Sequence, residues 1–149
     1  MTFQLGAKSN QELEGVDPPI CRVVRRAILI TPVDFSVHDG LRTLEEQREY
    51  VASGASTTMN SKHLEGLAVD LVPYINGKLR WEWPPIYKIA KAVKEAALIE
   101  GVSLVWGAVW DRRLESLNDL EIEVERYAER RRAAGKRVFL DGPHFQAAY

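Results

Sequence analysis

The chain has 149 residues, of which 46% are hydrophobic and 28% are charged, and its formal net charge is -1. These values fit one folded domain over 1–149 and exclude a disordered or fibrous chain, and the near balance of charges argues against non-specific attraction to nucleic acid or anionic membranes. Cys21 is the only cysteine, which excludes an internal disulfide and a thiolate-rich metal site.

The N-terminal third predicts two helices separated by a strand. A helix is expected over 17–31, because Asp-Pro-Pro with Asp17 as the cap is a typical helix start and Thr-Pro ends the helical spacing of apolar residues. A short strand over 33–37 follows. A Thr-Leu-Glu-Glu capping box then begins a second helix over 43–54, which a glycine can end. The small and polar residues at 54–62 predict a loop.

The middle of the chain predicts a strand, a hairpin turn and a third helix. Residues 67–72 alternate as in a strand, which places Asp70 on the face opposite the larger aliphatic side chains. The Asn-Gly pair within 75–78 predicts a tight hairpin turn, because both residues tolerate positive φ. A helix over 84–101 begins with two prolines and ends at a glycine, and a strand over 102–106 follows.

The C-terminal part predicts a charged helix and a turn. A helix is expected over 118–134, capped at Asn118. Its apolar stripe should pack on the domain through Leu120, Val124 and Tyr127, with Arg126, Arg130, Arg131 and Arg132 largely solvated. Short strand pieces at 138–140 and 145–146 should flank a turn over 141–144. Because helices and short antiparallel strands mix without regular βαβ alternation, the fold class is α+β, a single domain with a small antiparallel sheet flanked by helices.

Two motifs far apart in the sequence carry the residue types of a metal centre. His63 and Asp70 are seven positions apart with a glycine between them, so a loop folded onto a strand can bring them together. Pro143 breaks any helix, which allows Asp141 and His144 to lie on one turn and point into one cleft. Two imidazoles and one carboxylate make a three-ligand zinc site with an open position for water, and the other carboxylate is a candidate general base.

Other kinds of site find less support. A single histidine beside apolar residues is more often a packed or surface side chain, and this remains the interpretation of His38. A non-haem iron site also uses two histidines and one carboxylate, but its usual spacing places His and Asp two apart, unlike His63 and Asp70. The chain contains no G-x-S-x-G motif and no glycine-rich phosphate loop, and Cys21 has no plausible catalytic partner.

The motifs Ser61-x-His63-x-x-Gly66-x-Ala68-x-Asp70 and Asp141-x-x-His144-Phe145 resemble those of the peptidase M15 family. Within this family they are similar to the L-alanyl-D-glutamate endopeptidases that bacteriophages use as endolysins. The similarity covers nearly the whole chain, through Leu5-Gly6, the segment 40–43 with Gln47, and Trp106-Gly107. The resemblance implies the sheet of the hedgehog and D-Ala-D-Ala peptidase type. It also implies that His63, Asp70 and His144 bind zinc and that Asp141 is the general base.

The same resemblance implies that Arg42 and Ser61 line the substrate site. There a guanidinium can stabilise a developing oxyanion or hold a substrate carboxylate. The alternatives are a solvated charge before a helix cap for Arg42 and a loop hydroxyl for Ser61.

Two features depart from the family pattern. Relatives often have Trp-Gly-Gly-Asp-Trp where this chain has Trp-Gly-Ala-Val-Trp at 106–110, so any role of that aspartate is absent or moved, for example to Asp111. The charged helix over 118–134 is inserted where many members pass directly to the final motif. It is interpreted as a helix packed on the domain, and the functional alternative is a flap beside the substrate cleft.

The resemblance implies zinc-dependent hydrolysis of the L-alanyl-D-glutamate bond in peptidoglycan stem peptides. Peptidoglycan is then the partner, and nucleic acid, stable membrane association and oligomerisation are not expected. No apolar stretch approaches the length of a membrane helix and no secretory signal is recognisable, so the enzyme should accumulate in the host cytoplasm and reach the wall through a membrane pore. Without a separate wall-binding module, a thin Gram-negative wall is the expected target.

Two other functions remain open from the sequence. The same chemistry could act at D-alanyl-D-alanine, as a carboxypeptidase or dipeptidase, because selectivity depends on the shape of the cleft. The chain could also be a catalytically silent peptidoglycan-binding domain in which zinc only stabilises the fold.

Overall fold

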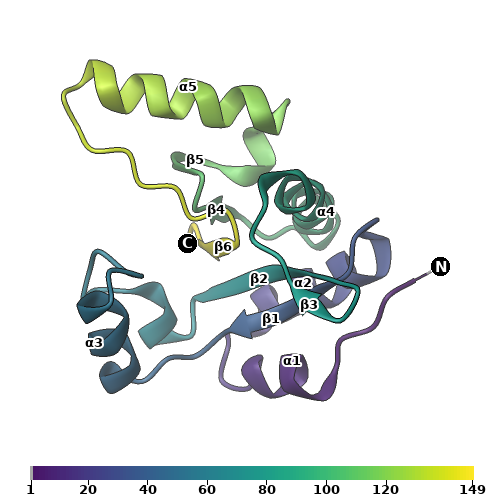
Figure 1. The fold of residues 1–149 in the computed structure, drawn as a ribbon. Coiled ribbons are helices and arrows are strands. Elements are labelled where there is room, and N and C mark those ends of the chain that lie inside the picture. Colours follow the sequence, from purple (N-terminus) through teal and green to yellow (C-terminus); the bar gives the residue numbers. More distant parts are fainter. Residues whose placement is uncertain (1) are drawn as a thin grey trace.

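An antiparallel sheet forms the centre of the computed structural model, which describes residues 2–149 (Figure 1). The strand order is β1-β2-β6-β4-β5, and β3 pairs with the far end of β2. The strands are β1 (Phe35–Asp39), β2 (Ala68–Ile75), β3 (Lys78–Leu79), β4 (Leu104–Trp106), β5 (Val109–Arg113) and β6 (His144–Ala147). All pairings are antiparallel, which confirms the α+β class.

The helices surround this sheet at its faces and ends. They are α1 (Ala7–Glu12), α2 (Pro18–Ile30), α3 (Leu44–Ala52), α4 (Trp83–Glu100) and α5 (Leu120–Ala133), with 3-10 turns η1 (Lys62–Glu65) and η2 (Leu114–Ser116). In Figure 1, α5 lies at the top beside β5 and α3 lies at the lower left, with β6 between them. Within residues 2–149, every helix is too short or too polar to span a bilayer.

The hydrophobic core lies between one face of the sheet and the pair α2 and α4. Helix α2 buries Ile20, Val23, Val24, Ala27 and Ile28, which recur at helical spacing. From the sheet, Val69 and Phe145 enter the same core and are directly paired across β2 and β6. Because paired residues share a face and neighbours alternate, the next pair, Asp70 and His144, points to the opposite face. This register leaves a polar patch on the side of the sheet that α2 and α4 do not cover.

Most elements expected from the sequence are present near their expected bounds. Thr43 and Glu46 form the reciprocal capping box of α3. Asn76 and Gly77 both have positive φ, 53° and 75°, in the turn that joins β2 to β3. Gly101 ends α4 in the left-handed conformation.

One of the expected caps is wrong, and another has the expected position but makes no capping bond. Asp17 stands at the start of α2, but its side chain makes no capping bond there and instead accepts a hydrogen bond from the Tyr149 hydroxyl. The cap of α5 is Asp119, which accepts from Ile122 N, and not Asn118. Two adjacent residues can both satisfy the cap pattern, and the path of the incoming chain decides between them.

Several elements differ from expectation, and the strands among them depend on pairing and not on local pattern. The first strand lies at 35–39 and not at 33–37, and residues 138–140 form no strand. Strand β5 and helix α1 were not expected, since β5 is rich in charge and α1 lacks a clear apolar stripe. His63 lies on the turn η1 and not in a loop.

Candidate metal centre

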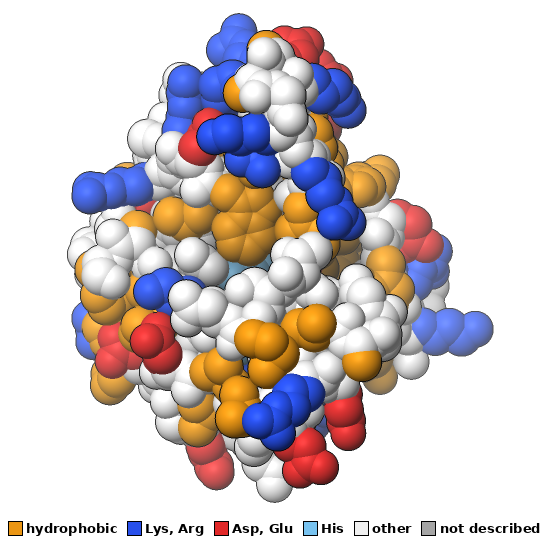
Figure 2. Space-filling view, turned by 90° about the vertical axis from the view of Figure 1, so that its left-hand side faces the viewer, with side chains coloured by type: hydrophobic (Ala, Val, Ile, Leu, Met, Phe, Trp, Pro, Cys, Tyr) orange, Lys and Arg blue, Asp and Glu red, His pale blue; other side chains and the backbone are white. Residues whose placement is uncertain are grey.

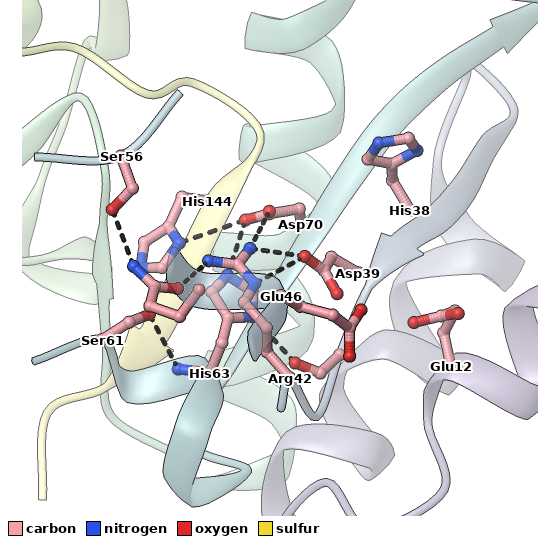
Figure 3. Close-up of polar contacts among 12 residues, drawn as sticks. Glu12, His38, Asp39, Arg42, Glu46, Ser56, Ser61, His63, Asp70 and His144 are labelled. Carbon is pink, nitrogen blue, oxygen red and sulfur yellow. Dashed lines mark hydrogen bonds and ion pairs between the residues drawn. The ribbon is translucent and has the colours of Figure 1, made fainter. Parts of the chain in front are cut away.

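Three side chains from two neighbouring strands and one turn converge on a single point (Figure 3). His63 lies on η1, Asp70 on β2 and His144 on β6. The Nε2 atom of His63 and the Nδ1 atom of His144 each lie 3.1 Å from the same oxygen, Oδ1 of Asp70. One ligand atom from each residue lies within 4.8 Å of the others. The structure therefore brings together the three residues expected to bind metal, although they span 82 positions.

The outer nitrogen of each imidazole is held by an acceptor. His63 Nδ1 lies 2.8 Å from the Gly40 carbonyl oxygen, and His144 Nε2 lies 2.9 Å from Gln146 Oε1. In a neutral imidazole these outer nitrogens carry the hydrogen, so both inner nitrogens present lone pairs. Two lone pairs and a carboxylate oxygen that face one another fit a divalent cation.

The backbone conformation on both sides of His63 fixes the position of its ring. Ser61 caps η1 and its Oγ accepts a hydrogen bond from His63 N at 3.2 Å. Gly66 ends the turn with φ 72°, and a Cβ there would lie 2.4 Å from the Gly15 carbonyl oxygen. Only glycine fits this left-handed and crowded position.

Arg42 lies beside the centre, but most of its guanidinium is bonded to protein (Figure 3). Its Nε donates to Asp39 Oδ2 at 2.8 Å, Nη2 donates to Asp39 and to Asp70 Oδ2, and Nη1 donates to Gln47 Oε1. The guanidinium also lies over the Tyr50 ring, 4.1 Å from its centroid. Arg42 and Asp39 are both buried, so this is an internal ion pair that reaches one metal-ligand candidate.

Asp141 lies on the turn before β6. His144 N donates to the Asp141 carbonyl, as expected for a turn over 141–144. Gly107 holds this turn from the neighbouring connection, because its carbonyl accepts from Asp141 N at 2.7 Å and its N–H donates to the His144 carbonyl at 2.8 Å. Within residues 2–149, the Asp141 carboxylate borders the same cleft as the three ligand candidates but is not a member of their cluster.

The charges in the cleft shift the pKa of two acids in opposite directions. Burial would raise the pKa of Asp70, but its hydrogen bonds with His144 and His63 outweigh burial and hold its pKa well below the ordinary value. For Asp141, burial and then the charge of Asp70 raise the pKa to about 6. Asp70 is therefore the anionic carboxylate of the pair, and Asp141 is the one better able to take up a proton.

A cleft of about 540 Å³ opens over the centre, and its lining includes all six residues singled out from the sequence. In Figure 2, the colour of histidine is visible at the bottom of a hollow, with hydrophobic side chains above it and Lys and Arg side chains higher still, toward the end where α5 lies. His38 also lies at the cleft, against Trp81 with ring centroids 5.5 Å apart, and is not part of the metal cluster.

The sequence did not single out the upper wall of this cleft. Trp110, Tyr127, Arg131 and Phe139 line it, and the Trp110 ring lies 5.1 Å from the His144 ring. Trp110 could have been suspected from the second tryptophan of the Trp-Gly-x-x-Trp pattern. Tyr127 and Arg131 belong to the helix for which the sequence left open a position beside the cleft, but each fits an ordinary position of an amphipathic helix and could not be singled out.

Helix α5 is tied to the sheet beside this wall. Arg130 makes two hydrogen bonds of 2.9 Å with Asp111 on β5. Arg126 and Arg132 are exposed, as expected, whereas Arg130 and Arg131 are only partly exposed. The helix both packs on the domain and borders the cleft.

Comparison with known proteins gives consistent matches over most of the chain. The family model for phage L-alanyl-D-glutamate peptidases matches residues 1–147. The chain is 36% identical to the L-alanyl-D-glutamate peptidase of Escherichia phage T5 over 115 residues, which are 74% of this chain and 84% of that protein. It is 33% identical to the L-alanyl-D-glutamate peptidase of Listeria phage A118 over 78 residues, 52% of this chain and 27% of that protein.

A solved structure is similar to this chain in both fold and sequence. The crystal structure of the L-Ala D-Glu endopeptidase ChiX of Serratia marcescens matches with a TM-score of 0.73 and 36% identity, and the match covers 97% of this chain and 90% of that chain.

Proposed function

The chain belongs to the family of phage L-alanyl-D-glutamate peptidases, and from this membership we propose that it is a zinc endopeptidase that hydrolyses the L-alanyl-D-glutamate bond of peptidoglycan stem peptides. The observation that carries the proposal is the convergence of two imidazoles and a carboxylate below a cleft that also contains a second, protonatable carboxylate. A site of this composition suits amide hydrolysis.

His63, Asp70 and His144 would hold the metal through Nε2, a carboxylate oxygen and Nδ1. Two nitrogens and one oxygen are a common donor set of catalytic zinc, which keeps one position open. When bound, zinc polarises the scissile carbonyl and lowers the pKa of a bound water to about 7. The acceptors at Gly40 and Gln146 keep the two imidazoles in the tautomers that such binding requires.

Asp141 is assigned as the general base. Its carboxylate borders the cleft but lies outside the ligand cluster, so it can act on a water molecule without occupying a coordination position. It would accept the proton of the attacking water and pass that proton to the leaving amine of the D-glutamyl residue. Burial raises the pKa of Asp141 above its ordinary value, which favours uptake of a proton from water.

Arg42 and Ser61 are assigned to substrate binding, and each also contacts a residue of the metal centre. Arg42 lines the cleft, and among residues 2–149 one hydrogen of its Nη1 has no protein acceptor, whereas its other donors bond Gln47, Asp39 and Asp70. The Ser61 hydroxyl accepts a hydrogen bond from His63 N at the start of η1, and Ser61 also lines the cleft.

The enzyme is further proposed to act as a monomer on the wall, after release of the chain from the host cytoplasm. The support is its similarity to peptidases of two phages. Fractionation of producing cells before and after addition of a pore-forming agent tests this: the protein should move from the cytoplasmic to the wall fraction only after the pore opens.

The decisive experiment is digestion of purified sacculi, with labelling of newly exposed amines and mass spectrometry of the fragments. The proposal requires new N-terminal D-glutamate, and His144→Ala is the inactive control. Release of free D-alanine would instead assign the enzyme to D-alanyl-D-alanine bonds, and binding to sacculi without any new amine would leave only a binding domain.

A further inference from the structure

The cleft contains several cations, and most of them are already engaged. Arg42 is bonded to Asp39, Gln47 and Asp70. Lys62 lies 3.7 Å from Glu65 at the surface. Each of these side chains therefore has a protein carboxylate close to it, which weakens its attraction for a further anion.

Arg131 differs because its end is free while its stem is held. Its Nε donates to the Arg137 carbonyl oxygen at 2.8 Å, and its own carbonyl accepts from Lys136 N at 2.8 Å, so the turn after α5 folds back on it. Among residues 2–149, neither terminal nitrogen of Arg131 has a hydrogen-bond partner. Arg131 also lines the cleft. A fixed guanidinium with two free amino groups is prepared to bind a carboxylate through two parallel hydrogen bonds.

An apolar wall connects this guanidinium to the metal centre. Trp110 lies against His144, and Phe139 stacks on Trp110 with ring centroids 6.3 Å apart. Tyr127, one helical turn before Arg131, is buried in the same wall. Beside such a wall, water screens an ion pair less than it does at an open surface, so the pair is stronger there.

The chemistry of the substrate supplies an anion for this guanidinium. Glutamate has two carboxyl groups, and only one of them forms the amide bond to the next residue of the stem. The other remains a free carboxylate close to the amine that cleavage releases. Asp70 and Asp141 line the cleft, and an ionised carboxylate offers such an anion no hydrogen-bond donor. A cation elsewhere in the cleft is therefore a better partner for the substrate carboxylate.

We propose that Arg131 binds the free carboxylate of the D-glutamyl residue and so determines specificity for an unmodified stem peptide. This inference rests on the proposed function, since it requires that the bond before D-glutamate enters the site. It gives helix α5 a function in substrate recognition as well as in packing.

The test compares two synthetic stem peptides that differ only in the free carboxyl group of D-glutamate, which is a carboxylate in one and a carboxamide in the other. The wild-type enzyme should cleave the carboxylate form with a kcat/KM about 10- to 100-fold higher, as expected for a charge-assisted pair. Arg131→Gln should lose this preference by slowing only the carboxylate form. Arg132→Gln removes the neighbouring exposed arginine and should keep the wild-type ratio.

The remaining outcomes separate this inference from the proposed function. If the wild-type enzyme cleaves both peptides equally, or if Arg131→Gln slows both by the same factor, the inference is wrong and the proposed function stands. If the wild-type enzyme cleaves neither peptide while sacculi are hydrolysed at another bond, the proposed bond is wrong and the role of Arg131 is wrong with it. Circular dichroism and zinc content of Arg131→Gln verify that the variant is folded.

Discussion

Asp70 and His144 are directly paired across β2 and β6, and His144 Nδ1 lies 3.1 Å from Asp70 Oδ1. The distance between these two ligand candidates is therefore set by the register of two strands and not by flexible loops. A shift of the register by one residue would turn one of the two side chains to the core face. The same pairing places Val69 against Phe145 in the core, so packing of the core and assembly of the metal centre depend on one register.

Removal of a ligand should abolish metal binding. His144→Ala is expected to lose zinc and activity together, because the two remaining ligands hold a cation weakly. Gln146→Ala should retain zinc with an affinity lower by about 10- to 100-fold, since only the acceptor behind His144 is lost. Elemental analysis and competition with a chelator measure both effects, with Gln11→Ala on the exposed face of α1 as the control. Full zinc occupancy in His144→Ala would contradict the assignment.

Asp141→Asn separates the general base from the ligands. The variant should keep its zinc, because Asp141 is outside the ligand cluster, and should lose about 10²- to 10⁴-fold in kcat. Single-turnover cleavage of a soluble stem peptide measures the loss. If the metal disappears with the carboxylate, then Asp141 is a ligand and the roles of Asp141 and Asp70 have been exchanged.

Arg42→Gln should affect both stability and the metal centre. The substitution leaves Asp39 buried without its cation, which costs about 3–5 kcal/mol when one partner of a buried pair is removed. It also frees Asp70 from one hydrogen bond, so zinc affinity should fall. Urea unfolding and zinc titration measure the two effects, and Arg48→Gln on the exposed face of α3 is the control. A variant with unchanged stability would show that the ion pair contributes nothing to the fold.

Gly107→Ala should disturb the site through the backbone. A Cβ at this position would lie 2.3 Å from the Asp141 carbonyl oxygen and 3.0 Å from His144 Cβ, so the turn that carries both residues must move. Overpacking of this kind costs about 1–3 kcal/mol. Activity should fall further than the loss of stability explains, because the base and a ligand are displaced together. Gly135→Ala, with open space around its Cβ, provides a comparison in which strain comes only from positive φ, and there kcat should be retained.

The pair of Asp111 and Arg130 should stabilise α5 in a pH-dependent manner. The hydrogen bonds from Arg130 lower the pKa of Asp111, so the folded state binds its proton less tightly than the unfolded state does. The stabilisation is therefore present above the ordinary pKa of aspartate, about 4, and is lost as the pH falls through the lowered value. Both side chains are partly exposed, so the effect at neutral pH should be at most about 1 kcal/mol. Unfolding of Asp111→Asn beside wild type at pH 7 and at low pH measures it; a difference that grows on acidification would contradict the sign.

The sequence by itself determined the elements whose signals are local. The capping box at Thr43, the Asn-Gly hairpin and the proline-to-glycine helix over 84–101 depend on contacts within a few residues, and all three are present. The residues expected to bind metal likewise stand in two short motifs whose spacing could be recognised in the sequence. Their resemblance to a known family supplied the role of each residue, which spacing alone left open.

Only the tertiary structure decided which residues meet. Strand β5 forms because β4 lies beside it, and the choice between Asn118 and Asp119 as a cap depends on the path of the incoming chain. Arg130 and Arg131 are consecutive and chemically identical, yet Asp111 on β5 engages one, while the two terminal nitrogens of the other have no hydrogen-bond partner among residues 2–149 and lie at the cleft. The reason is physical: hydrogen bonding and burial depend on distances between segments far apart in the chain, and no local pattern of residues contains those distances.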